Sequence, residues 1–288
     1  MAAGALVCVS VLVRAQSTSP QLPTAIPSVR FNSGQNIAPY FEGWIKNADG
    51  TFDLVFGYFN RNYQEEVAIA PGPENRVEPG NPDQGQPTYF LPRRQRWVFR
   101  VRVPADFGKK TLTWTVTAHG RTDKAYGELL PVQEITERII MTNGGLDPGE
   151  DDPNKPPAIS IASGGSITAT TGTPLTLTAN VADDGLPKPR VPAAPRPTAP
   201  APTGSQGNFG AQVNSSGAAP RFRGLAVTWM ELRGPAKVTF DPAGAIPVAN
   251  GQAVTHARFT APGTYKLVAT ANDGALSRKT ELTVTVRE

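Results

Sequence analysis

Hydrophobic and polar residues alternate along much of the chain, in short runs separated by glycine, proline, asparagine and aspartate. The clearest run in the first half is residues 52–58, in which every second residue is aromatic or aliphatic while Asp53 lies on the other face. Because side chains alternate between the two faces of a strand, this run predicts a β-strand. Asp49 and Gly50 come just before it, and an Asp-Gly pair is a typical hairpin turn.

Similar runs continue through the first half and predict five to seven strands within about 105 residues. The runs 96–103 and 112–116 alternate in the same way, and the residues expected to face the core in the first of them are Trp97, Phe99, Val101 and Val103. Residues 37–45 are the other strand of the hairpin at Asp49-Gly50, and residues 125–130 and 135–141 are candidates for the last strands. Residues 70–87 are rich in proline, glycine, asparagine and aspartate, and predict an irregular surface loop. This number of strands suits one sandwich domain, with bounds 36–142.

The second half predicts another sandwich, residues 158–288. Short alternating runs recur there, broken by Gly-Pro, Pro-Gly and Asp-Gly pairs. Residues 143–157 are acidic and proline-rich, which is typical of a linker between domains. Residues 186–223 are rich in proline, alanine, glycine and serine with almost no large apolar side chains, so we expect a long disordered insert between two strands.

Five short motifs in the second half occur together in a known class of module. They are Asp183-Asp184-Gly185, Val227-Thr228-Trp229, Gly234-Pro235, Pro262-Gly263-Thr264-Tyr265 and Asn272-Asp273-Gly274. As a set, over about residues 157–287, they resemble the PKD-like and wider immunoglobulin-like modules of bacterial surface and exported proteins. The resemblance implies a role for Trp229 in the core and departs from the pattern at the insert. Such modules act mostly as spacers, adhesion units or carbohydrate-contacting accessories.

The first half resembles uncharacterised exported bacterial proteins, through residues 58–62 and 85–88, and this resemblance carries no functional residue. The expected fold class is therefore all-β, with two immunoglobulin-like antiparallel β-sandwich domains in tandem.

The start of the chain predicts export. Residues 2–13 form an apolar run too short to span a membrane, and Val13 and Ala15 are small residues at the spacing of a signal-peptidase site. We expect a secretory signal over residues 1–15 and a flexible leader over residues 16–35, which predicts a periplasmic or extracellular protein; the alternative is a disordered or mispredicted start. Cys8 is the single cysteine, so a chain cut after Ala15 would have no disulfide.

Charge and hydropathy argue against nucleic acid as a partner and against insertion into a membrane. Lysine and arginine exceed aspartate and glutamate by 28 − 24 = 4, well short of the concentrated charge of a nucleic-acid binder. No later apolar run is long enough for a transmembrane helix, so we expect no stable membrane insertion.

Carboxylates near the predicted linker suggest a calcium site. In an immunoglobulin-like topology two loops of the second domain would meet the linker at one end, and the candidate ligands are Asp151, Asp152, Asp183, Asp184 and Asp273. Ca²⁺ prefers several hard oxygen ligands. The alternative is that Asp-Gly pairs simply make turns, with the side chains bonded to nearby backbone. No other cofactor is expected.

Two further sets of residues are candidates for ligand binding. Arg96, Arg100 and Arg102 form a row on one strand face that could bind an acidic glycan or a phosphate-bearing polymer, and the alternative is a solvated or salt-bridged sheet face. Tyr63 and Tyr89 are expected in loops, where they could stack on sugar rings, and the alternative is burial in a core.

Catalytic motifs are missing from the sequence. It has no nucleophile elbow, phosphate loop or Cys-His pair, and its two histidines are isolated. We therefore expect a non-enzymatic exported protein with a structural or binding role, such as adhesion, whose partner would be an envelope protein or a polysaccharide. A glycan-binding accessory protein is the alternative, and a hydrolase in the first domain is less favoured. The sequence does not predict an oligomeric state.

Overall fold

The computed structural model describes residues 30–142, 149, 151–188 and 224–288. The predicted signal, residues 16–29 of the leader, residues 143–148 and 150 of the linker and residues 189–223 of the insert lie outside the described residues. Phe31–Glu288 form one compact unit. No helix in the described part of the chain is long and apolar enough to cross a membrane.

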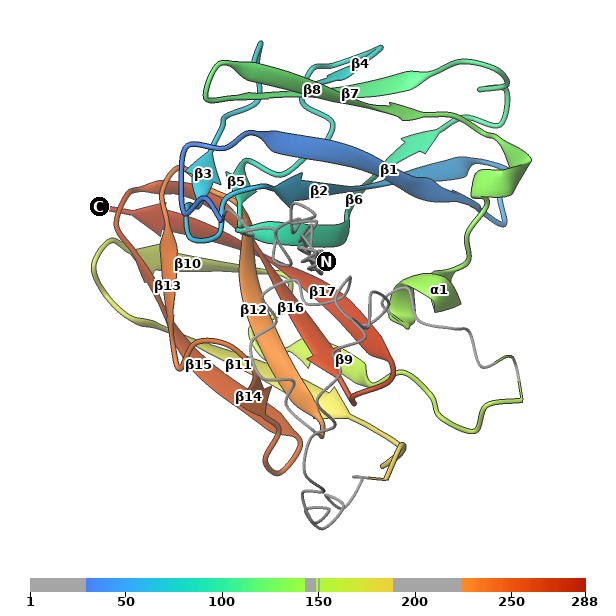
Figure 1. The fold of residues 1–288 in the computed structure, drawn as a ribbon. Helices are drawn as coiled ribbons and strands as arrows, with labels where there is room; N and C mark the ends of the chain where they lie inside the picture. Colours follow the sequence, from blue (N-terminus) through green and yellow to red (C-terminus); the bar gives the residue numbers. More distant parts are fainter. Residues whose placement is uncertain (1–29, 143–148, 150, 189–223) are drawn as a thin grey trace, which may run out of the picture. The chain divides into compact units, whose positions relative to one another are not determined.

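The first sandwich consists of strands β1 to β8 (Figure 1). One sheet has the order β1-β2-β6, built from β1 (Ile37–Lys46), β2 (Phe52–Asn60) and β6 (Arg93–Val103). The other has the order β4-β7-β8, built from β4 (Asn75–Glu78), β7 (Leu112–Ala118) and β8 (Arg121–Gly127). The short strands β3 (Val67–Ala68) and β5 (Tyr89–Phe90) pair with each other.

The predicted hairpin at Asp49-Gly50 is confirmed. β1 and β2 pair antiparallel with Lys46 opposite Phe52. The turn closes through hydrogen bonds from Gly50 N to Asn47 O at 3.0 Å and from Asn47 N to Thr51 O at 2.8 Å. Gly50 has a φ of +85°, a backbone conformation that glycine adopts without steric cost.

Trp114 lies at the centre of the core between these two sheets. Its side chain is fully buried, and the rings of Phe56, Phe90 and Phe99 surround it with centroid distances of 4.8 to 6.3 Å. Its Nε1 donates to Asn75 Oδ1 at 3.0 Å, so the polar end of the indole is also satisfied. This cluster buries the alternating faces that the sequence predicts.

Trp97 does not face this core, and here the prediction was wrong. The pairing of β2 with β6 shifts register between Phe56 and Tyr58, and Trp97 adopts a φ of +48°. Such a bulge re-aims a side chain. Trp97 therefore packs on the outer face of the sheet with Ile45 and Val55, while Phe99, Val101 and Val103 face the core as expected.

Residues 135–141 are not a strand. Helix η1 (Pro131–Gln133) and helix α1 (Glu137–Met141) follow β8, and the Thr136 side chain caps α1 by accepting from Ile139 N at 3.3 Å. Ile139 and Ile140 then cover the outer cluster of Trp97. The short helix thus packs its half-buried isoleucines against the outer face of the sheet.

The second sandwich consists of strands β9 to β17. One sheet has the order β13-β15-β11-β9, built from β9 (Ala158–Ile161), β11 (Leu175–Ala182), β13 (Val238–Asp241) and β15 (Gln252–Phe259). The other has the order β10-β17-β16-β12-β14, built from β10 (Ser166–Thr170), β12 (Ala226–Arg233), β14 (Ile246–Pro247), β16 (Gly263–Asn272) and β17 (Ser277–Arg287).

The strand order of the second sandwich is that of an immunoglobulin domain. β9, β11, β15 and β13 correspond to strands A, B, E and D of one sheet, and β12, β16 and β17 to strands C, F and G of the other. Trp229 on β12 lies in the core, and the Tyr265 hydroxyl donates to Ala261 O at 2.8 Å, which is the tyrosine corner of this fold. The fold class is therefore confirmed, although β10 pairs with β17 in parallel.

Candidate functional site

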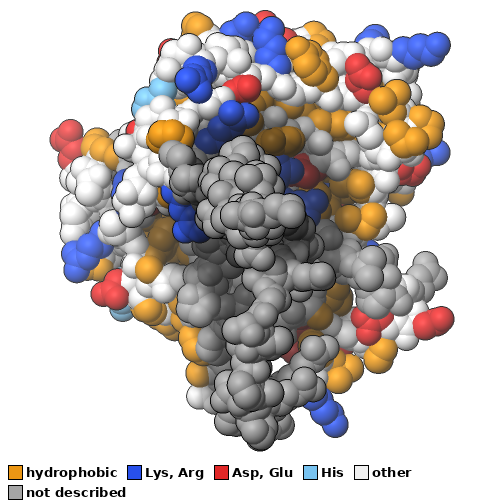
Figure 2. All heavy atoms as spheres, in the orientation of Figure 1, with side chains coloured by type: hydrophobic (Ala, Val, Ile, Leu, Met, Phe, Trp, Pro, Cys, Tyr) orange, Lys and Arg blue, Asp and Glu red, His pale blue; other side chains and the backbone are white. Residues whose placement is uncertain are grey.

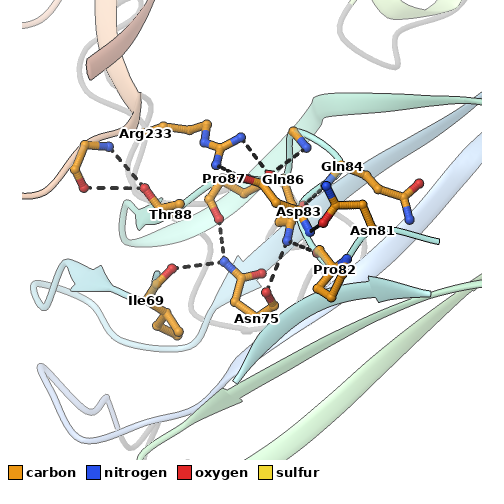
Figure 3. A network of polar contacts seen from close by, with 12 residues as sticks. Ile69, Asn75, Asn81, Pro82, Asp83, Gln84, Gln86, Pro87, Thr88 and Arg233 are labelled. Carbon is orange, nitrogen blue, oxygen red and sulfur yellow. Dashed lines mark hydrogen bonds and ion pairs between the residues drawn. The ribbon is translucent and has the colours of Figure 1, made fainter. Parts of the chain in front are cut away.

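The segment between β3 and β5 contains residues 70–87, which the sequence predicts as an irregular surface loop, but in the structure it is held by specific hydrogen bonds. It contains β4, and the buried side chain of Asn75 holds both ends of the segment: its Nδ2 donates to Ile69 O at 3.0 Å and to Pro87 O at 2.8 Å (Figure 3). Gln86, also buried, donates from Nε2 to Pro82 O at 2.7 Å and to Asn75 O at 3.1 Å. These amides replace the sheet hydrogen bonds that the backbone lacks here, and they fix the segment on the core.

This ordered segment bonds directly to the second sandwich. Arg233, at the end of β12, makes a two-pronged contact with Asp83, from Nη1 to Oδ1 at 3.0 Å and from Nη2 to Oδ2 at 2.7 Å (Figure 3). Thr88 N donates to Leu232 O at 3.1 Å, and Gly234 N donates to Thr88 Oγ1 at 3.1 Å. The hydrogen bonds from Arg233 lower the pKa of Asp83, so the pair is charged at neutral pH. We call the region of Asp83, Thr88 and Arg233–Gly234 the junction.

A buried carboxyl group lies beside the junction. Glu231 is only 2% exposed, and its Oε2 accepts from Val238 N at 2.8 Å while Oε1 has no hydrogen-bond partner among the described residues. Burial raises the pKa of Glu231 to about 7, and the charge of Glu66 adds to this, against the opposing effects of the hydrogen bond from Val238 N and of Lys237. Glu66 itself accepts from the Tyr89 hydroxyl at 2.5 Å and from Lys237 Nζ at 3.0 Å.

A second contact region joins the sandwiches through β17. Lys279 Nζ on β17 donates to Trp97 O at 3.1 Å, and Ser277 Oγ donates to Met141 O at 3.1 Å. Helix α1 contacts β17 as well. The two sandwiches are therefore held together at two places distant in sequence.

An open hollow of about 480 Å³ lies at the junction. Its walls are residues 68–71 and Thr88 of the first sandwich and residues 233–235 and 263–264 of the second. Of the described residues that line it, Arg233 is the only charged one, and its guanidinium is engaged by Asp83. The remaining walls are small or apolar side chains and backbone, which suit binding better than acid–base chemistry.

Glycine at two of these positions allows close packing. A Cβ on Gly234 would lie 2.3 Å from Glu231 Oε1 and from a ring carbon of Tyr265, and one on Gly263 would lie 2.9 Å from Pro235 Cγ. The Gly-Pro and Pro-Gly pairs therefore shape the hollow as well as the turns.

The arginine row lies away from the hollow, on the outer face of the first sandwich, and is salt-bridged. Arg102 Nε donates to Asp53 Oδ1 at 3.0 Å, Arg96 Nε lies 3.8 Å from Glu42 Oε2, and Arg100 forms a fork with Glu137. These contacts match the structural alternative for the row. On the face shown in Figure 2, basic and acidic side chains are likewise interspersed.

The structure separates the two candidate tyrosines. Tyr63 is half-buried, with the Arg93 guanidinium carbon 3.9 Å from its ring centroid. The expectation of an exposed Tyr89 was wrong: it is 6% exposed, because it lies on β5 and its hydroxyl is bonded to Glu66 near the junction.

The five candidate calcium ligands differ in their surroundings. Asp151 is exposed; Asp152 contacts Arg138 at 3.3 Å; Asp184 accepts from the amides of Leu186 and Lys155, both at 2.9 Å. Asp183 and Asp273 each cap a turn with one oxygen, as the turn alternative predicts. No group of three or more His, Cys, Asp or Glu side chains in the described ranges is arranged to hold a metal ion.

Comparisons with known proteins indicate no catalytic family. No family model and no curated protein matches the chain. Among solved structures, it is similar to the D00-D0 domain of intimin (11% identity, 88% of this chain and 100% of that chain, TM-score 0.27). It is also similar to domains 4 and 5 of the S-layer protein SbsC (11% identity, 88% of this chain and 98% of that chain, TM-score 0.25). A third similar structure is a chimeric titin Z1Z2-Z1Z2 tandem (11% identity, 86% of this chain and 93% of that chain, TM-score 0.25). The immunoglobulin-like assignment of the second sandwich follows from its strand order and not from these values.

Proposed function

We propose that the chain is a non-enzymatic, exported binding module in which the two sandwiches act as one rigid unit. The observation that carries this proposal is the junction, where Arg233 forks onto Asp83 and Thr88 exchanges hydrogen bonds with β12 and Gly234. Domains joined only by a linker move independently by default. Direct bonds between them instead support a fixed geometry, which a structural or adhesive protein needs. The motif resemblance to PKD-like modules supports the same role.

The hollow at the junction is the proposed binding surface, and its partner is an extended, apolar segment of an envelope protein. Most of its walls, at residues 68–71, 234–235 and 263–264, are small or apolar side chains, which leave room for such a segment. A polysaccharide is the less favoured partner, because Tyr89, one of the two tyrosines expected to stack on sugar rings, is buried.

Charge reversal at the junction tests its rigidity. Arg233→Glu places two carboxylates in contact and should lower the melting temperature by a few degrees, since partly exposed ion pairs contribute about 0.2–1 kcal/mol and repulsion adds to the loss. It should also enlarge the radius of gyration measured by small-angle X-ray scattering. The double variant Asp83→Arg/Arg233→Asp should restore both quantities.

Lys109→Glu is the matched control, because Lys109 is an exposed residue of the first sandwich away from the junction. It should change neither quantity. Unchanged scattering for Arg233→Glu, or a double variant no better than the single one, would contradict the rigid-unit proposal.

Filling the hollow tests the binding surface. Ala70 lines the hollow and is exposed, so Ala70→Trp should block the space without disturbing the core. We expect the wild type to retain a protein from envelope fractions of its host, and Ala70→Trp to lose at least about 90% of it. Ala243→Trp, an exposed site between β13 and β14, should retain it. Equal capture by all three proteins would place the binding surface elsewhere.

A further inference from the structure

One end of the second sandwich collects polar groups from three separate segments. Asp183 directly follows β11, Asp273 directly follows β16, and Asn154 lies four residues before β9. Ala182, the last residue of β11, pairs with Ala158, the first of β9, and β9 also contacts β16. The topology therefore places the three side chains at the same end, where the chain enters the second sandwich.

Each of the two aspartates uses one carboxylate oxygen and leaves the other unbonded. Asp183 Oδ2 accepts from Gly185 N at 3.0 Å, and Asp273 Oδ1 accepts from Ala275 N and Leu276 N, both at 2.7 Å. Asp183 Oδ1 and Asp273 Oδ2 are both buried and have no hydrogen-bond partner within the described part of the chain. Turn formation thus explains the position of one oxygen of each carboxylate, but it does not explain why the other oxygen is buried.

Asn154 supplies an independent observation. Its side chain is 6% exposed, yet neither its Oδ1 nor its Nδ2 has a partner among the residues that the structure describes. The next residue, Lys155, donates its amide to Asp184 Oδ2 at 2.9 Å, which holds Asn154 beside the turn that carries Asp183. A buried polar group without a partner costs about 1–3 kcal/mol, so a partner for this one is to be expected.

Electrostatics points to a cation as that partner. The unbonded oxygens Asp183 Oδ1 and Asp273 Oδ2 are both shielded from solvent, and two carboxylates at one end of the sandwich repel each other. A cation would remove the repulsion and bind the free oxygens at once. Carboxylate and amide oxygens are hard ligands of the kind that Ca²⁺ takes, and water or backbone carbonyls would complete its six to eight ligands.

We propose that Asp183, Asp273 and Asn154 bind a calcium ion at the end of the second sandwich. The set differs from the five aspartates suggested by the sequence, because Asp152 and Asp184 are already bonded and Asp151 is exposed. A bound ion would fix the entry of the linker into β9. This site is separate from the hollow, so each can fail without the other.

Calcium titration of the full chain tests the site. After removal of metal with a chelator, calcium should bind with a dissociation constant of about 10⁻⁴–10⁻³ M by isothermal titration calorimetry, since only two carboxylates take part. About 10 mM calcium should raise the melting temperature by roughly 3–10 °C. Magnesium at the same concentration should have a smaller effect, because it demands stricter geometry.

Variants separate the ion from a simpler explanation, a proton shared by the two aspartates. Asp183→Asn, Asp273→Asn and Asn154→Ala should each weaken calcium binding at least about tenfold, and Asp151→Asn, a matched change in the same linker, should not. Loss of the calcium response in Asn154→Ala is the distinctive result, because a shared proton does not involve that amide. The proposal is overturned if calcium leaves the wild-type melting temperature and heat of titration unchanged, or if the three ligand variants respond like the wild type.

Discussion

Trp114→Ala is expected to destabilise the first sandwich more than any other single truncation in its core. The side chain is fully buried among Phe56, Phe90 and Phe99, so the variant loses its contacts and leaves a cavity. Such truncations cost about 3–5 kcal/mol. Asn75 Oδ1 also loses its donor at 3.0 Å, which adds about 1–3 kcal/mol. The melting temperature measured by calorimetry should fall by roughly 10–20 °C.

Two comparisons show where that loss comes from. Trp114→Phe keeps an aromatic ring but not the N–H donor, so it should lose clearly less stability than the alanine variant. Tyr126→Ala removes a ring that is 56% exposed on the neighbouring strand β8, and should change stability by less than about 0.5 kcal/mol. If Trp114→Ala melts within a few degrees of the wild type, Trp114 does not organise the core as we infer.

Alternation predicted the strands well wherever one face is buried and one is open. In the second half of β6 and of β17 every second side chain is apolar and buried, because a shift of one residue would expose the whole buried face. The Asp49-Gly50 turn was equally predictable, since few residue pairs adopt the required backbone conformation. These features are determined by residues that are close together in the chain, so one sequence is enough to predict them.

The errors occur where distant parts of the chain decide the local structure. Trp97 faces outward because of a bulge against β2, and residues 137–141 are helical because they cover the outer face of a sheet formed by other segments. The segment around Asn75 has the sequence of an irregular loop, because a sequence does not distinguish an asparagine or glutamine that will be buried from one that will be exposed. Its order comes from side-chain amides bonded to backbone that lies up to twelve residues away.

The junction could not be predicted for the same reason. Asp83 and Arg233 are 150 residues apart, and each alone looks like an ordinary surface charge. Gly234-Pro235 predicted a turn, but nothing in it indicates that the turn contacts Thr88. The sequence predicted that the three arginines lie in a row. It could not predict their acidic partners, because these come from neighbouring strands and from α1.

Glu231 is expected to make the stability of the protein depend on pH. Its pKa is about 7 in the folded protein and 4.5 as the ordinary value, so the folded state holds its proton more tightly than the unfolded state. The stabilisation is fully present below pH 4.5 and is lost as the pH rises through 7. The difference corresponds to at most about 3 kcal/mol. Other titratable groups near Glu231 are Glu66, Lys237, Tyr89 and Tyr265.

Glu231→Gln should therefore stabilise the protein at high pH. Glutamine stays neutral, and its carbonyl oxygen can still accept from Val238 N, so the variant avoids the cost of a buried charge. At pH 8 its free energy of unfolding in a urea titration should exceed that of the wild type by up to about 3 kcal/mol. Near pH 5 the advantage should largely disappear, because the wild-type side chain is then protonated.

The decisive quantity is the difference between variant and wild type at the two pH values, since the titration of every other carboxyl group cancels in it. Glu74→Gln is the matched control, because Glu74 is an exposed carboxyl group of the first sandwich, and its variant should show the same difference from the wild type at both pH values. An advantage of Glu231→Gln that is equal at both pH values would mean that packing, and not a buried charge, governs this position. An advantage confined to high pH would instead identify Glu231 as a carboxyl group kept beside the junction at a cost in stability.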